Sequence, residues 1–198
     1  APGPTFSSKD GSWSVHVLGR LQVDGGALGD DDDFYKNDNA TELRRARLGA
    51  EGNFYEGWKY RFEADFANSS LDVKDAYIEY SGEFVEPAYV RVGQYKTPNS
   101  LEQVGSDLFT TFMEKAAIID AFELDYQIGL GSGVTGDNWR VDAGLFGQNA
   151  SEQQDNEGYA LAARGHYAFF PDPEDRGENS SQVVHLGASA RYRNFDND

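Results

Sequence analysis

Apolar and polar residues alternate along this sequence, and the pattern returns about nine times. It is clearest in the segment WKYRFEADFA, from Trp58 to Ala67, where every second residue is apolar and most of the others are charged. Because successive side chains of a β-strand point to opposite faces, this segment predicts a strand with one apolar and one charged face. The segment from Trp13 to Asp24 has the same pattern. The alternation therefore indicates a sheet that separates an apolar medium from water.

The composition excludes several classes of protein. The 198 residues are 39% hydrophobic and 14% aromatic, which is too apolar for a disordered chain. No run approaches the ~18 apolar residues that indicate a spanning helix, whereas a strand of a membrane barrel needs only ~9–11 residues. The absence of cysteine excludes disulfides and thiolate ligands. A net charge of −17 disfavours nucleic acid as a partner.

The alternating segments predict an all-β, antiparallel meander that closes into a transmembrane β-barrel. Long polar connections follow the first, fifth and seventh strands, and most of the others are short, which is the asymmetry of outer-membrane barrels. Trp13, Trp58 and Trp139 each begin a strand on its apolar face, as in an aromatic girdle at the membrane interface. A soluble, ligand-binding β-sandwich is the alternative. The expected strands are residues 13–24, 42–54, 58–67, 71–80, 88–95, 126–134, 139–146, 158–169 and 182–193.

Six segments, taken in chain order, are similar to a known protein family. They are ELRRARLGAEG (42–52), WKYRFEADFA (58–67), KDAYIEY (74–80), VRVGQYKTPNSLE (90–102), TTFMEKA (110–116) and GYALAARGHYAFFP (158–171). Together they resemble the phosphate-selective porin family, porins O and P, from about Trp13 to the end of the chain. The resemblance implies homotrimers of sixteen-stranded barrels in the bacterial outer membrane, which pass phosphate or polyphosphate through a lumen lined with arginine and lysine. It also implies that residues 96–125 fold inward and narrow the pore.

About nine strands are too few for a sixteen-stranded barrel. An open sheet edge in hydrocarbon leaves backbone groups unpaired, at several kcal/mol each. We therefore expect residues 1–198 to be the N-terminal portion of a longer barrel domain, with a mature N-terminus because Ala1 does not open an export signal. A complete small barrel of eight to ten strands, with little open channel, is the alternative.

The polar face of the strands carries the candidate anion-binding residues. A guanidinium stays charged and donates two hydrogen bonds at once to phosphate, and a series of sites of moderate strength lets an anion enter and leave. Arg20 lies on the strand that pairs with the strand of Arg45 and Arg47, so these three are expected to cluster. The candidates in the strands are Arg20, Arg45, Arg47, Arg61, Arg91, Arg140 and Arg164. Lys96 and Lys115, in the long connection, are added by the family resemblance alone.

Each arginine also has a structural interpretation, because carboxylates on the same face can pair with it to hold the wall together. These carboxylates are Glu51, Glu63, Asp65, Asp75, Glu79 and Asp142. We interpret His16, His166 and His185 as ordinary polar lumen residues, since none has a partner at a metal-ligand spacing. No nucleophile motif or phosphate-binding glycine loop occurs, so we expect neither enzymatic activity nor a cofactor.

The acidic balance opposes a simple phosphate channel. The sequence has 34 aspartate and glutamate residues against 17 lysine and arginine residues, and this field repels phosphate at long range. Much of the excess lies in connections such as 30–33, and salt limits its reach to about 10 Å or less. The expected function is thus passive diffusion of small anions. The alternative is an outer-membrane anchoring barrel whose acidic loops bind a surface partner or divalent cations, although residues 29–33 lack the spacing of a defined calcium loop.

Overall fold

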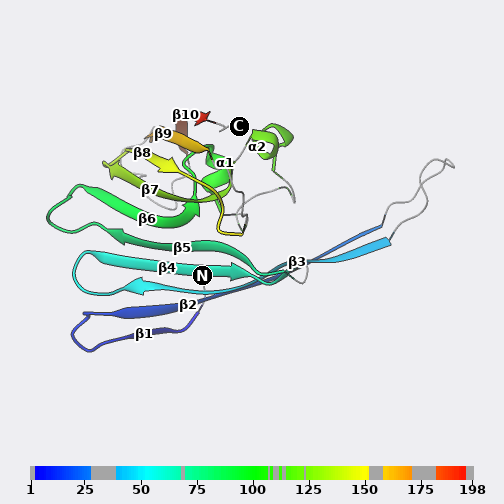
Figure 1. The fold of residues 1–198 in the computed structure, drawn as a ribbon, viewed down its shortest axis with the longest axis horizontal. Coiled ribbons are helices and arrows are strands. Elements are labelled where there is room, and N and C mark those ends of the chain that lie inside the picture. The colour runs from blue at the N-terminus through cyan, green and yellow to red at the C-terminus, as the bar shows by residue number, and fades with distance from the viewer. Residues whose placement is uncertain are drawn as a thin grey trace.

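The computed structural model describes residues 3–27, 39–67, 70–106, 108, 112, 115–122, 124–151, 158–170 and 182–194. Their strands form one ten-stranded sheet, in which each strand pairs antiparallel with its neighbours in sequence (Figure 1). The strands are β1 (Thr5–Ser7), β2 (Ser14–Ala27), β3 (Asn39–Asn53), β4 (Trp58–Asp65), β5 (Asp72–Tyr80), β6 (Ala88–Lys96), β7 (Tyr126–Thr135), β8 (Trp139–Phe146), β9 (Tyr159–Phe169) and β10 (Val184–Asn194). The all-β antiparallel meander is therefore confirmed.

Nine of these strands overlap the ranges expected from the sequence, and β1 was missed because three residues are too few to show an alternation. β2 and β3 extend beyond their neighbours (Figure 1) and continue past the expected end at Asp24, where Gly25 pairs with Thr41. In this part of the ladder the two strands pair through their backbones, although the sequence there does not alternate between apolar and polar residues. In the described part of the chain β1 pairs only with β2 and β10 only with β9, so the sheet is open. The acidic run at residues 29–33 lies outside the described residues.

One face of the sheet, here called the outer face, exposes large apolar side chains. Directly opposite residues of neighbouring strands share a face, and such pairs form an unbroken row across β5 to β10. Each residue of this row exposes between 41% and 57% of its surface. A continuous exposed apolar band does not suit a water-facing wall but suits contact with lipid hydrocarbon. The row consists of Ile78, Val92, Leu130, Leu145, Leu161 and Tyr192.

Aromatic rings gather at one rim of this outer face. Trp13, Trp58 and Trp139 begin or precede β2, β4 and β8, and all three are more than one-third exposed. Each lies opposite another aromatic residue, and the Trp58 ring is 4.9 Å from that of its partner. Amphipathic rings at one level are typical of a membrane interface. The partners are Phe54, Tyr80 and Tyr167, respectively.

The opposite face, here called the inner face, holds the charged side chains and a small aromatic core. Tyr95 and Phe146 pack with their ring centroids 5.4 Å apart and are buried with two alanines of β9. Three successive inner positions of β7 are Gly129, Gly131 and Gly133. A side chain on these glycines would overlap rings of β6 and β8, so their absence lets the rings lie flat against the backbone.

Two short helices follow β6, namely α1 (Leu101–Val104) and α2 (Ala117–Phe122). None of the described helices is long and apolar enough to span a membrane.

Candidate functional site

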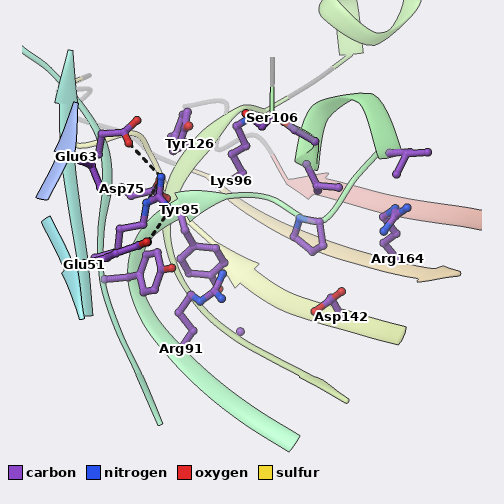
Figure 2. Close-up of a pocket in the computed structure, with 18 of the residues that line it drawn as sticks. Glu51, Glu63, Asp75, Arg91, Tyr95, Lys96, Ser106, Tyr126, Asp142 and Arg164 are labelled. Carbon is purple, nitrogen blue, oxygen red and sulfur yellow. Dashed lines mark hydrogen bonds and ion pairs between the residues drawn. The ribbon is translucent and has the colours of Figure 1, made fainter. Parts of the chain in front are cut away.

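A cavity of about 1010 Å³ opens on the inner face, and residues of β2 to β10 and of the connection after β6 line it (Figure 2). The strand alternation turns the predicted arginines toward this cavity. Seven of the nine predicted site residues are among its lining residues, and Arg45 and Lys115 are not. The seven are Arg20, Arg47, Arg61, Arg91, Lys96, Arg140 and Arg164.

Arg20 and Arg47 lie directly opposite each other on β2 and β3, so two of the three residues expected to cluster are neighbours. Arg47 Nε donates to Asp65 Oδ2 at 2.8 Å, and its Nη1 donates to Glu63 Oε1 at 3.4 Å. Arg45 donates instead to the side-chain carbonyl of Gln22 at 2.8 Å. Arg47 is therefore both a cavity residue and a structural ion-pair partner.

Arg61 is surrounded by carboxylates. Its Nη1 and Nη2 donate to Glu51 at 2.9 Å and Glu63 at 3.0 Å, and its Nε lies 3.1 Å from Asp75 Oδ2. Figure 2 shows these carboxylates converging from adjacent strands. Since Glu63 also accepts from Arg47, the β3–β5 part of the cavity is a connected network in which acidic groups outnumber the guanidinium groups.

Arg91 is held by an ion pair and by three aromatic rings. Both Nε and Nη2 donate to Glu79 Oε2, at 2.9 and 2.5 Å. The guanidinium carbon lies 4.3 Å from the ring centroid of Tyr77 and 5.0 Å from those of Tyr89 and Tyr95. Such contacts stabilise a cation and fix its orientation. The sequence reasoning missed these tyrosines, although Tyr89 and Tyr95 share the strand face of Arg91.

On β8, Arg140 and Asp142 form a second fixed pair. Arg140 Nε lies 2.8 Å from Asp142 Oδ2, and Nη2 donates to Oδ1 at 2.9 Å. The hydroxyl of Tyr89 also donates to Asp142 Oδ1, at 2.6 Å. The hydrogen-bonding capacity of this carboxylate is therefore largely used within the wall.

Arg164, on β9, differs from the other cavity arginines. Only 6% of its surface is exposed, and within the described part of the chain it forms no ion pair with a carboxylate. Its Nη1 lies 3.0 Å from His166 Nδ1, and the His166 ring lies 4.8 Å from that of His185 on β10. The histidines were interpreted from sequence as ordinary polar residues, because the β9–β10 register that joins them is not visible in their spacing.

The first part of the long connection is fastened to the inner face. Lys96 Nζ donates to the carbonyl oxygens of Gln103 at 2.8 Å and Gly105 at 3.2 Å. The fully buried Gln103 side chain donates to Thr97 Oγ1 at 3.1 Å, and Ser100 Oγ caps α1. Lys96 thus lines the cavity and also anchors the connection.

The same connection reaches across to the far end of the sheet. Ser189 of β10 donates to Asn99 Oδ1 at 3.1 Å, Arg191 of β10 donates to the carbonyl of Phe122, and Leu124 packs on the Tyr95 core.

In the described residues no group of three or more potential ligands is arranged to hold a metal ion.

An antiparallel meander with a lipid-compatible outer face, an aromatic rim and a charged, hollowed inner face defines a porin wall. The family model described as phosphate-selective porin O and P matches residues 15–198. The chain therefore belongs to this family, whose members are outer-membrane porins of bacteria. This result confirms the resemblance and the location expected from the sequence.

The chain is also similar to an uncharacterized protein from Caulobacter vibrioides. The two are 29% identical over 202 residues, which cover 96% of this chain and 38% of the relative. The chain thus spans less than two-fifths of the length of this curated relative.

Proposed function

We propose that residues 1–198 contribute part of the wall of an outer-membrane pore through which small anions, phosphate or polyphosphate among them, diffuse passively. The observation that carries this proposal is that six arginines from six different strands line one cavity on the polar face of the sheet. Guanidinium groups at successive positions offer an anion several hydrogen-bonding sites, so no single site needs to bind it tightly.

The pairing of most of these arginines is compatible with transport. A guanidinium has five N–H donors, and one carboxylate uses at most two or three of them. Any N–H donors that these pairs leave unused are available to an anion that passes through the cavity. Moderate affinity at each step favours rapid passage, whereas a row of bare arginines would retain the anion.

The connection at 96–125 is proposed to narrow this pore. Its Lys96 anchor and its contacts with β10 support a position across the inner face. The residues of this connection that line the cavity are Lys96, Pro98, Leu101, Val104, Gly105, Ser106 and Leu108. Lys115 stays a predicted anion contact, and assembly into a homotrimer is part of the same proposal.

Ion selectivity of the full-length protein in planar lipid bilayers tests the function. With a potassium chloride gradient, we expect a reversal potential of the sign given by chloride permeation. Replacing Arg164 by glutamine should lower the anion preference. Lys9 lies in the exposed β1–β2 turn, outside the cavity, so its replacement by glutamine removes an equal charge and should leave the anion preference unchanged. A cation-selective wild-type channel would contradict the proposal.

An anchoring barrel is the second candidate function. It is favoured by the carboxylate pairing of Arg47, Arg61, Arg91 and Arg140, which resembles a reinforced wall, and by the net charge of −17. In this case acidic loops would bind divalent cations or a surface partner. Full-length protein that inserts into bilayers without conducting, and that binds calcium in equilibrium dialysis, would favour this function over the porin.

A further inference from the structure

The inner face of β8–β10 carries a cluster of one arginine and two histidines, and the proposed series of arginine sites does not account for the histidines. Arg164 is buried beside the cavity, and Asp142, directly opposite it on β8, forms no ion pair with it because this carboxylate is bonded to Arg140 and Tyr89. His166 and His185 lie next to Arg164 with their rings 4.8 Å apart. All three line the cavity. A buried cation normally requires an anion or a full set of hydrogen bonds, so this arrangement favours an anionic ligand.

The hydrogen bond between Arg164 and His166 fixes the protonation state of the imidazole. Arginine can only donate, so His166 Nδ1 must accept the bond at 3.0 Å and carries no proton. The proton of the neutral ring is therefore on Nε2. Uptake of a second proton at Nδ1 would end this bond and place two cations side by side, which an anion between them would relieve.

The charges that face His166 come from three strands. On β8, Arg140 lies directly opposite His166, and Asp142 is already bonded to Arg140 and to the Tyr89 hydroxyl. On β9 the neighbour is Arg164, and on β10 it is His185. At the end of β6, Lys96 also lines the cavity, and its ammonium donates to backbone carbonyls. Asp142 is thus the one carboxylate in this set, and arginines and histidines outnumber it.

We propose that Arg164, His166 and His185 form a binding site for tetrahedral oxyanions of charge −2, such as sulfate or hydrogen phosphate, and that this site binds more tightly as its imidazoles take up protons. The proposal rests on the proposed anion pore and names one of its binding steps. Arg164 supplies a permanent charge and two parallel donors. Each protonated imidazole adds one charge and one donor.

The direction of the pH dependence follows from these charges. An imidazole that takes up a proton gains one positive charge. Acidification therefore adds positive charge to the site and strengthens oxyanion binding. One added charge about 4 Å from a divalent anion is worth about 2 kcal/mol in a water-like medium, which corresponds to roughly thirtyfold in affinity before screening by salt.

Block of chloride current by sulfate in the full-length protein tests the site. Sulfate is the probe because it stays divalent across the range used, whereas phosphate itself titrates. As the pH is lowered in steps from about 8 to about 4.5, we expect the half-blocking sulfate concentration of the wild type to fall about fivefold or more.

The variants His166→Gln and His185→Gln should each flatten this dependence. His16→Gln is the matched control, because His16 also lies on a strand but its Nδ1 is 2.8 Å from Thr5 Oγ1 and it is not among the cavity residues. This control should keep the full pH dependence. His185→Asn gives a second test in case His166→Gln does not insert.

The outcomes separate this site from the proposed function. A wild type that remains anion-selective across this pH range, with sulfate block independent of pH, would overturn the site and leave the anion pore standing. Sulfate block that depends on pH in both histidine variants as strongly as in the wild type would also overturn the site. Cation selectivity in the same membranes would contradict the pore itself.

Discussion

Glu79 and Arg91 lie directly opposite each other on β5 and β6, and a single carboxylate oxygen of Glu79 accepts two hydrogen bonds from the guanidinium, at 2.9 and 2.5 Å. This pair, with its surrounding tyrosine rings, fixes the position of one cavity arginine. The second carboxylate oxygen lies 3.7 Å from the Lys59 ammonium. Glu79 therefore pairs with a cation of β4 and a cation of β6.

Replacing Glu79 by glutamine should raise the anion preference of the pore, because it removes one negative charge and leaves Arg91 without its carboxylate. We expect a loss of about 1–3 kcal/mol in the free energy of unfolding, since the pair is largely buried. Reversal potentials and urea unfolding in detergent measure the two effects. Glu51→Gln is the control for stability and should cost less free energy of unfolding, because Arg61 keeps Glu63 and Asp75.

A side chain at Gly131 should destabilise the sheet. A Cβ there would overlap the Tyr95 hydroxyl and lie 3.1 Å from the Ala143 carbonyl oxygen. For Gly131→Ala we expect a cost of about 1–3 kcal/mol, measured as a lower unfolding midpoint in urea. Gly19→Ala is the control, because nothing lies within 4 Å of a Cβ at that glycine. Equal stability of the two variants would show that β6 and β8 side chains do not rest on the β7 backbone.

An arginine at Leu130 tests whether the outer face contacts lipid. Leu130 is 56% exposed in the middle of β7, so an arginine there would be tolerated on a water-facing wall. In hydrocarbon it should cost about 2–4 kcal/mol, whereas Val134→Arg, on the same face near the β7–β8 turn, should cost about 0–1 kcal/mol. Folding into liposomes at graded urea concentrations gives both values. No cost at Leu130 would contradict a lipid-facing sheet.

Replacing Lys96 by methionine should loosen the connection after β6, because the two backbone carbonyls that accept hydrogen bonds from its ammonium lose this donor. We expect a larger and noisier single-channel conductance in planar bilayers. If Lys96 acts only as a cation of the pore, the conductance noise will stay the same and the anion preference alone will fall. Lys96→Arg, which retains donors and charge, is the comparison.

Asp10 in the β1–β2 turn should titrate at an unusually low pH. Hydrogen bonds from Ser8 and Ser12 lower its pKa from 3.8 to about 2. Because the folded-state pKa is below the unfolded value, the stabilisation by this carboxylate is present above pH 3.8 and is lost as the pH falls through about 2. Carboxyl carbon shifts from nuclear magnetic resonance should follow this midpoint, and Ser8→Ala with Ser12→Ala should return it toward 3.8.

The alternation predicted the fold well because each strand separates two media. Residues 139–146 were predicted as a strand, and β8 covers the same residues. The same alternation predicted seven arginines on the polar face, and six of them line the cavity. The family resemblance supplied the class of protein, and the family comparison confirmed it.

The contacts between side chains were less accessible from the sequence, because they depend on register. Arg61 lies opposite Glu51 on β3 and Tyr77 on β5, and these alignments decide which carboxylates surround it. The His166–His185 contact depends similarly on how β9 aligns with β10. A pattern of period two assigns each side chain to a face but not to a partner on the next strand.

Glu63 accepts hydrogen bonds from both Arg47 and Arg61, so these two cations share one counter-charge. Removing either arginine frees Glu63 to bind the other more strongly, and the two losses will not add independently. A double-mutant cycle on Arg47 and Arg61 should therefore give a non-zero coupling energy that vanishes when Glu63 is replaced. Measured one at a time, neither substitution reports what a single arginine does for ion passage.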